Sequence, residues 1–350
     1  MVTVLQIKQM VSQAYFGDAV MTETDYSRGR KLFIAEGCCA NGVVTLTTGA
    51  FLSGYAGYLG ADDSLNGIIG SIPVLLCTLQ MFSSVVLENL RQKKFLIACF
   101  ALIHRLLLSS VFFVPLVVED NAGRLVAVVA IYVVAHFFGA FIGTGTGSWL
   151  LSLVPENIRG TYLGRKDAFA FAFTTVLSLL CGRILDWMRG AHQDLLGYYI
   201  IGLIVLSTAF TDFWCLSSIR EPVQETHRRS LKAAVIDPLL DREYRKVIGL
   251  YMFWNLALQV AGPFFSVYMV TGLSLDYTYI TFLGLIASSV RVVAACFWGR
   301  LADATSWLHA ARCSMLLLGL VHTSWLFMTP ATCLILQPIL QALSGAAWGG

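Results

Sequence analysis

Apolar stretches that exceed the roughly 18 residues of a membrane-spanning helix recur along the whole sequence. Of its 350 residues, 57% are hydrophobic and 13% are charged, whereas soluble domains have about 25% charged residues. A soluble globule and a singly anchored protein are both excluded, so the sequence predicts an all-α membrane protein. Hydrophobic windows place ten spans, at residues 32–56, 65–87, 95–117, 125–150, 168–187, 197–218, 247–270, 278–299, 309–328 and 331–350.

The motifs of most other protein classes are absent from the sequence. It contains no P-loop, HExxH or dinucleotide-binding glycine pattern, so we expect neither an enzyme, a cofactor nor ATP hydrolysis. The nine cysteines lie mostly in apolar runs without ligand spacing, which predicts neither a metal site nor a disulfide framework. The basic residues are spread over short loops, which leaves no surface for nucleic acid.

Lys and Arg residues are distributed unequally between the loops on the two sides of the membrane. Because basic residues near span ends are retained in the cytoplasm, this bias gives the orientation. Only Arg124 and Arg189 lie in loops on one side, and the N-terminus and the long central loop share the other side. That basic side carries Lys8, Arg28, Arg30, Lys31, Arg91, Lys93, Lys94, Arg159, Arg165, Lys166, Arg220, Arg228, Arg229, Lys232, Arg242, Arg245, Lys246, Arg300 and Arg312. We therefore expect the N-terminus to be cytoplasmic and the protein to lie in the cell membrane as a multi-pass protein.

The order of the spans predicts two halves joined by a long loop. Residues 1–31 form a cytoplasmic segment that is too polar for a cleaved signal peptide, and residues 32–218 form a six-helix half. Residues 219–246 form a basic cytoplasmic loop, and residues 247–350 form a second half with four spans. The ending of span four, 145–149 (GTGSW), recurs in span ten as 345–348 (GAAW). The two halves are therefore expected to be pseudo-symmetric.

Several loop motifs resemble those of the major facilitator superfamily of secondary transporters, in particular its bacterial solute-transporter branches. The family's loop between spans two and three is matched degenerately by 88–94 (ENLRQKK) and more clearly, in the second half, by 299–303 (GRLAD). The loop after span four, 155–165 (PENIRGTYLGR), resembles the family's Pro-Glu-x-x-Arg-Gly loop. The resemblance covers essentially the whole chain and implies a helical bundle of two halves that works by alternating access. The family normally has twelve spans, so about ten of the expected twelve are present here and spans eleven and twelve are absent. Span five also lacks the family's glycine-proline antiporter motif.

Polar residues at helical spacing in two apolar spans predict a solute cavity, because a polar group that faces lipid unpaired costs several kcal/mol. The resemblance implies that spans one and seven both line the central cavity. An alternative is that the threonines bond carbonyls of their own helix; the two amides of span seven are harder to explain in that way. The candidate cavity residues are Asn41, Thr45 and Thr48 in span one, and Tyr251, Asn255 and Gln259 in span seven.

Ionisable residues inside spans are candidates for coupling or substrate contact. Glu36 is expected to carry a proton, unless it is an interfacial acid paired with Arg30 or Lys31. Arg105 is expected to form a structural ion pair within the first half rather than to contact substrate.

Three further ionisable residues lie in spans four, six and eight. His136 is expected to titrate or, more simply, to pack through a hydrogen bond. Arg291 is expected to hold an anion or carboxylate, or to snorkel. Asp212 is expected to pair with Arg220 or a loop residue.

The resemblance also implies a cytoplasmic gate, in which acids and arginines at the ends of spans two, four, eight and ten form ion pairs that latch one state. Exposed pairs contribute about 0–1 kcal/mol each, and several together can bias a two-state equilibrium. The alternative is that these charges only set topology. The matching positions are Glu88, Arg91, Glu156, Arg159, Arg165, Arg300 and Asp303.

These features together predict a secondary active transporter that moves a small solute across a lipid bilayer, coupled to protons and acting as a monomer. The alternative from another class is a non-transporting membrane sensor or an inactive, truncated transporter remnant. Flux of a solute through the purified chain distinguishes the two.

The charge bias gives a direct topological prediction. A reporter fused after Lys232 should be cytoplasmic, and a reporter inserted near Asn121 should be outside the cell. Finding both reporters on the same side would contradict the assignment of the spans.

Overall fold

The computed structural model describes residues 21–88, 90, 92–222, 236–237, 239–271, 273, 275 and 277–350, and every regular element in these residues is helical. Within them, eight helices or helix pairs are long and apolar enough to cross a membrane. The predicted all-α, multi-pass membrane fold is therefore confirmed. The helices are α2 (Glu23–Thr47), α3 (Gly49–Tyr58), α4 (Asp63–Cys77), α5 (Gln80–Glu88), α6 (Lys94–Val111), α7 (Asn121–Leu153), α8 (Arg159–Gly190), α9 (Asp194–Ser218), α11 (Arg242–Thr271), α12 (Tyr277–Ala304), α13 (Trp307–Ser324) and α14 (Cys333–Trp348), with short 3-10 turns at Val114–Leu116, Glu156–Ile158 and Trp325–Phe327.

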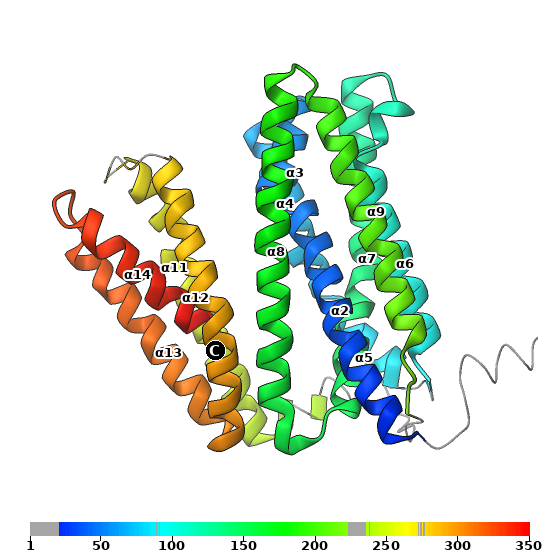
Figure 1. Cartoon of the computed structure of the whole chain (residues 1–350), viewed down its shortest axis with the longest axis vertical. Helices are drawn as coiled ribbons and strands as arrows, with labels where there is room; N and C mark the ends of the chain where they lie inside the picture. Colours follow the sequence, from blue (N-terminus) through cyan, green and yellow to red (C-terminus); the bar gives the residue numbers. More distant parts are fainter. Residues whose placement is uncertain are drawn as a thin grey trace, which may run out of the picture. The chain divides into compact units, whose positions relative to one another are not determined.

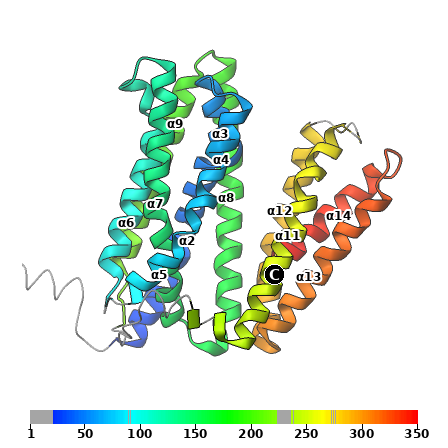
Figure 2. The ribbon, with the colours of Figure 1, turned by 180° about the vertical axis from the view of Figure 1, so that it is seen from behind.

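The chain divides into two compact units of contacting helices (Figures 1 and 2). Unit 1 comprises Met1–Pro155 with Phe173–Arg229, and unit 2 comprises Glu156–Ala172 with Ser230–Gly350. Helix α8 contributes its first half to unit 2 and its second half to unit 1. The division of the sequence into halves at residues 219–246 remains a prediction.

Helix starts follow from capping side chains, because the first amides of a helix have no partner within it. Asp62 accepts a hydrogen bond from the amide of Leu65 at 2.8 Å, which starts α4. Asp120 caps α7 in the same way, and Thr22 caps α2 together with Asp25 in a capping box. Short polar residues thus set where these apolar helices begin.

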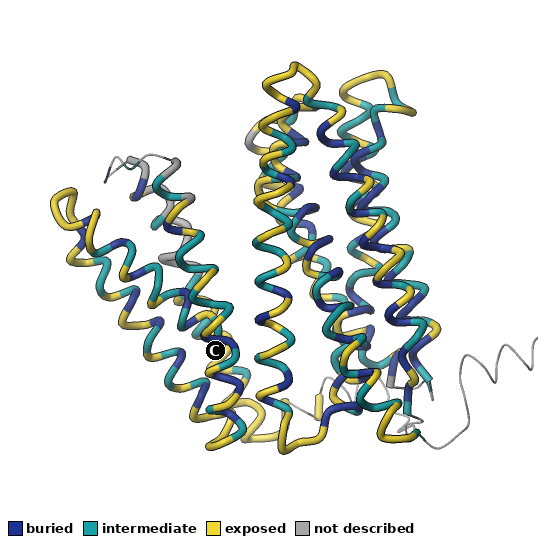
Figure 3. Tube along the Cα trace, in the orientation of Figure 1, coloured by how far each residue is buried: buried dark blue, intermediate teal, exposed yellow. Residues whose placement is uncertain are grey.

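Exposed residues occur along most of the helices, as the backbone trace coloured by burial shows (Figure 3), and many of them are large and apolar. Val74 and Trp187 in unit 1, and Val293, Leu316 and Ile335 in unit 2, are each about 70% exposed or more. A soluble protein does not display so many exposed apolar side chains, whereas a hydrocarbon environment accepts them. The outer faces are therefore suited to contact lipid.

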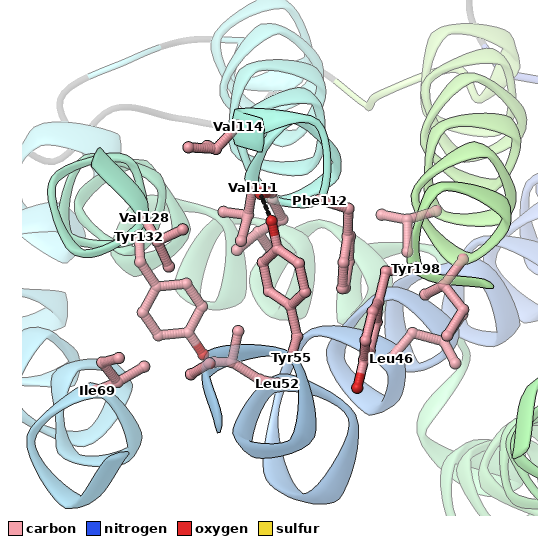
Figure 4. Close-up of a cluster of buried hydrophobic side chains, with 14 of the residues drawn as sticks. Leu46, Leu52, Tyr55, Ile69, Val111, Phe112, Val114, Val128, Tyr132 and Tyr198 are labelled. Atoms are coloured by element: carbon pink, nitrogen blue, oxygen red, sulfur yellow. Dashed lines mark hydrogen bonds between the residues drawn. The ribbon is translucent and has the colours of Figure 1, made fainter. Parts of the chain in front are cut away.

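The main core of unit 1 is built around buried tyrosines (Figure 4). The ring of Tyr55 packs against Phe112 and Tyr198, with ring centroids 5.2 and 5.0 Å apart. Its hydroxyl donates a hydrogen bond to the carbonyl of Val111 at 3.0 Å. Because that donor is satisfied, the whole side chain is buried without an unpaired polar atom.

Span one is a broken helix, a feature that hydropathy did not predict. Thr48 has an extended backbone between α2 and α3, and Gly49 has φ +53°, a conformation that glycine adopts at low cost. The break frees carbonyls at the end of α2, two of which accept side-chain hydrogen bonds. The hydroxyl of Thr48 donates to Val44, and that of Tyr132 on α7 donates to Thr47 at 3.1 Å. The broken helix is thus held by partners that the lipid does not supply.

A carboxylate from the end of α9 caps a helix far away in sequence. Both oxygens of Glu221 accept the amide of Lys93, at 3.0 and 2.8 Å, and one oxygen also accepts the amide of Lys94. Burial raises the pKa of Glu221, and these amide hydrogen bonds oppose that shift. The start of α6 is therefore tied to the end of α9.

The bond from Tyr132 to the broken helix gives a stability prediction. Tyr132→Phe leaves the Thr47 carbonyl without that donor, so the variant should lose about 1–2 kcal/mol of unfolding free energy. Thermal unfolding of the detergent-solubilised chain measures this loss, and Tyr58→Phe, at an exposed ring in the same unit, is the control. Equal stability of the two variants would show that the bond does not hold the break.

Candidate functional site

Three ionisable side chains from three helices meet inside unit 1. Nη1 of Arg105 on α6 lies 2.7 Å from Oδ2 of Asp212 on α9. Nη2 of the same arginine lies 3.7 Å from Oε1 of Glu36 on α2. Helices α2, α6 and α9 pack against one another, which brings these distant positions together (Figure 1). We call Glu36, Arg105 and Asp212 the buried charge triad.

The triad is shielded from the surroundings of the protein. The side chains of Glu36, Arg105 and Asp212 are 8%, 4% and 0% exposed, respectively. Breaking a pair this deeply buried costs about 3–5 kcal/mol, because the remaining charge has no solvent. The three residues therefore form one electrostatic unit.

The closest contact in the triad is an ion pair without hydrogen-bond geometry. Among the described residues, neither oxygen of Asp212 has a hydrogen-bond partner, and neither does Nη1 of Arg105. A carboxylate buried in this way normally accepts several hydrogen bonds. Asp212 thus retains unused acceptor capacity at the centre of the unit.

Two histidines lie beside the triad, between α6 and α7. The ring of His104, next to Arg105 in sequence, meets the ring of His136 edge-on, with centroids 5.4 Å apart. His136 also meets Tyr132 at 4.4 Å. Neither histidine has a hydrogen-bond partner for Nε2 among the described residues. His136 thus packs against His104 and Tyr132.

The triad changes two of the expectations for the N-terminal half. Asp212 was expected to pair with Arg220, but Arg220 pairs with Asp25 at 3.1 Å and Asp212 pairs with Arg105 instead. Glu36 is buried against Arg105, and Arg30 forms an ion pair with Glu23 at 3.1 Å. The sequence offered no signal for these partners because the rotation of each helix decides which residues meet.

The polar residues expected to face a cavity in span one bond within their own helix. The amide nitrogen of Asn41 donates to the carbonyl of Gly37, and the hydroxyl of Thr45 donates to that of Asn41, each at 2.8 Å. Thr48 donates to Val44 in the same way. The structure thus shows the alternative for the threonines, which is bonding to their own helix. Among the described residues, Asn41, Thr45 and Thr48 have no other polar partner.

A polar cavity lies within unit 2, among α11, α13 and α14. Its volume is about 420 Å³, and it is partly open. Asn255 lines it and donates a hydrogen bond to the carbonyl of Tyr251 at 2.8 Å. Tyr251 is 59% exposed, and the side chain of Gln259 lies outside the described residues. The polar lining comprises Asn255, His322, Gln341 and Ser344, and the aromatic lining comprises Phe265, Trp325 and Trp348.

Sequence analysis did not identify the other polar residues of this cavity. Nδ1 of His322 lies 2.8 Å from the carbonyl of Leu318 one turn earlier, which fixes the orientation of its ring. The ring of Phe265 stacks on Trp325, with centroids 4.5 Å apart. His322 is a single polar residue of span nine without a spacing signal. In span ten, however, Gln337, Gln341 and Ser344 stand at helical spacing, a signal that sequence analysis did not use.

The start of α8 packs very closely against α12 within unit 2. Gly160 and Gly164 face Ala295 and Gly299, and a Cβ on Gly164 would collide with the backbone of Ala295. Asp303 accepts the amide of Gly160 at 2.6 Å and also that of Thr161. A carboxylate at a helix N-terminus is stabilised by both the free amides and the helix dipole. Small residues and one acid thus join two membrane helices.

Arg291 lies one turn before this contact and faces an aromatic ring. Its guanidinium carbon is 4.0 Å from the centroid of Phe171 on α8, which is a cation–π contact. Asp167 is the charged group that acts on it. The structure therefore gives Arg291 an aromatic partner that neither sequence alternative included.

The other expected gate residues whose side chains the structure describes are not joined in one network. Glu156 lies 3.9 Å from Arg159, and its side chain is 90% exposed. Arg165 lies over the ring of Phe169 at 5.7 Å, and Arg300 is exposed. Arg91 and the side chain of Glu88 lie outside the described residues. Of the predicted gate set, Asp303 has the contact that ties two helices together.

The described residues contain no group of three or more His, Cys, Asp or Glu side chains arranged to hold a metal ion. Cys39 and Cys215 lie near the buried charge triad, and both are free thiols.

Comparison with known proteins identifies the fold. No family model matches the sequence, and no curated protein matches it. The structure is similar to two crystal structures of a bacterial homologue of the iron transporter ferroportin in an outward-facing state, one with soaked iron. Each has a TM-score of 0.67, with 16% and 14% sequence identity; the matches cover 95% and 94% of this chain and 82% of each of those chains. The chain has a membrane-transporter fold. Its membership of the major facilitator superfamily and the absence of two spans remain predictions.

The contact between Asp303 and α8 gives a prediction for stability. Asp303→Asn removes the charge that the amides and the dipole stabilise, so it should lower the unfolding free energy by about 1–2 kcal/mol. Asp237→Asn, at an exposed acid of the same unit, is the matched control. Thermal unfolding in detergent compares the two, and an Asp303 variant as stable as the control would contradict the role of this contact.

Proposed function

We propose that the chain is a secondary transporter that moves a small, uncharged solute by alternating access and that protons drive it. The transporter fold supports a role in membrane transport. We also propose that it works as a monomer in the cell membrane with a cytoplasmic N-terminus, as the loop charges favour.

The observation that carries the proposal is the polar cavity of unit 2. Its volume of about 420 Å³ lies within the range of small-molecule sites, and its lining combines aromatic rings with few polar groups. None of the lining residues carries a fixed charge. A neutral solute with a flat apolar face and hydrogen-bonding groups matches this lining better than an ion does.

The neighbours are homologues of an iron transporter, but the described cavity does not favour iron for this chain. Iron is bound by imidazole, carboxylate or thiolate ligands. The cavity offers one imidazole, His322, and no acid or thiol among its lining residues. We therefore propose an uncharged solute as the cargo.

Close packing at the start of α8 supports the conformational part of the proposal. Glycines let the backbones of α8 and α12 approach closely, and together with Asp303 this contact would hold one state of the transporter. Asp303 would then release the amides of Gly160 and Thr161 as the cytoplasmic gate opens. Glu36 is proposed as the group that loads the driving proton.

Solute flux through the purified chain in liposomes tests the proposal. Asn255→Leu removes a hydrogen-bonding amide from the cavity, so it should reduce uptake of a transported uncharged solute about tenfold or more, equivalent to about 1.4 kcal/mol. Hexoses, nucleosides and aromatic amides, with charged analogues of each, are the compounds to test. Tyr244→Phe, at an exposed ring on the same helix and outside the cavity lining, is the control and should retain uptake.

The outcomes separate the candidate functions. Uptake of charged analogues with equal efficiency would contradict the proposed solute class. Binding without flux would favour the sensor alternative, and neither binding nor flux would favour an inactive remnant.

A further inference from the structure

We infer that the cavity of unit 2 recognises a neutral, planar carboxamide and that the buried amide of Gln337, on α14, forms hydrogen bonds with it. The inference names the class of solute, and to that extent it rests on the proposed transport function. Binding of a carboxamide to the cavity does not depend on transport.

The side chain of Gln337 is fully buried and unpaired. Gln337 is 0% exposed, and among the described residues neither its amide nitrogen nor its amide oxygen has a hydrogen-bond partner. A glutamine amide has two donor hydrogens and an acceptor oxygen. Buried polar groups are normally paired, because an orphaned group loses the bonds that it would make to water. A polar ligand that enters from the cavity would supply the missing partners.

Gln337 lies on the face of α14 that lines the cavity. Gln341 and Ser344 follow it at i+4 and i+7, which places the three residues on one side of the helix. Both of these residues line the cavity. Gln337 is one turn, about 5.4 Å, from Gln341 along the helix axis. The polar side of α14 therefore continues from the cavity to a buried amide.

Apolar side chains bound the cavity on the side of Gln337. Met269, Val321 and Leu340 line the cavity and also belong to a buried cluster that contains Cys333, one turn before Gln337. Methionine is unbranched and has three rotatable bonds, so it adapts to a new neighbour more easily than a branched side chain does. A solute that displaces the side chain of Met269 would reach the amide without movement of a helix.

The local backbone does not explain a glutamine at position 337. Pro338 lies inside α14 and has no N–H group, so the carbonyl of Leu334, four residues earlier, loses its helical partner. The hydroxyl of Tyr279 on α12 donates to that carbonyl at 3.1 Å. Because Tyr279 already satisfies the freed carbonyl, the amide of Gln337 is left for another partner.

The histidine of the cavity adds an acceptor to the glutamine amides. Nδ1 of His322 lies 2.8 Å from the carbonyl of Leu318. Because a carbonyl oxygen only accepts, Nδ1 carries the hydrogen, and Nε2 of the neutral ring is then an acceptor. The cavity thus combines an acceptor on α13 with amides on α14 that both donate and accept. A carboxamide offers the N–H and C=O groups that match them.

A planar aromatic carboxamide fits this lining better than a sugar does. Two amides can pair through parallel N–H···O bonds, much as a glutamine amide pairs with the edge of a base. The stacked rings of Phe265 and Trp325 offer a flat apolar face to an aromatic ring. A sugar carries hydroxyls all round its ring, and Leu258 and Leu340 would leave some of them unpaired.

Calorimetric titration of the full chain in lipid nanodiscs with benzamide and acetophenone tests this inference, with empty nanodiscs as the blank. The ketone has a methyl group where benzamide has its amide nitrogen. The wild type should bind benzamide at least tenfold more tightly than acetophenone. Gln337→Met removes the polar atoms and keeps the length of the side chain. It should weaken benzamide binding about tenfold, equivalent to about 1.4 kcal/mol, and leave acetophenone binding within twofold.

A matched variant and a stability measurement separate a binding role from a structural one. Gln193→Met, at an exposed glutamine of unit 1, should bind both probes as the wild type does. Because the amide of Gln337 has no partner in the folded chain, Gln337→Met should not lower the melting temperature measured without a probe. A melting temperature several degrees below that of the wild type would show that the amide holds the fold, and it would overturn the inference.

Three binding results would also overturn the inference. These are no binding of benzamide, equal affinity for the two probes, or benzamide binding that Gln337→Met leaves unchanged. Failure of the proposed transport is distinguishable. Binding of benzamide without flux of any solute supports the site and refutes transport, whereas flux of an uncharged solute without binding of benzamide does the reverse.

Discussion

A membrane interior offers no water to hydrogen-bond polar groups, and this constraint shapes each notable feature of the chain. The freed carbonyl of Thr47 at the break in span one is met by Tyr132. The carboxylates of Glu221 and Asp303, which come from distant parts of the sequence, accept hydrogen bonds from the first amides of α6 and α8. Polar atoms inside the structure thus join helices, and the apolar faces are left for lipid.

The buried charge triad is a place where this constraint is met incompletely. Arg105 lies between two acids, and the oxygens of Asp212 have no hydrogen-bond partner among the described residues. Breaking an ion pair buried this deeply costs about 3–5 kcal/mol, so the contacts of Arg105 help to hold α2, α6 and α9 together.

The sequence predicted where the helices lie, but it did not predict which side chains of different helices contact one another. Apolar length placed the spans, since lipid sets how long each must be. It missed the break at Thr48 and Gly49 because a hydropathy average does not report backbone dihedral angles. Glu36 and Arg105 were identified because charges are rare in spans, but Asp212 was assigned the wrong partner, since helix rotation is not encoded in hydropathy. The cavity residue His322 carried no sequence signal, whereas Gln341 stands at helical spacing with Gln337 and Ser344 and was overlooked.

The most direct test of the central claim, the proposal that Glu36 couples a proton to solute movement, is proton flux in proteoliposomes that contain a pH-sensitive dye. A transported uncharged solute is placed on one side of the liposome membrane, and the pH inside the liposomes is followed. Wild-type protein should move protons with the solute, whereas Glu36→Gln should carry the solute down its gradient without moving protons. Equal proton movement by both proteins would contradict the claim.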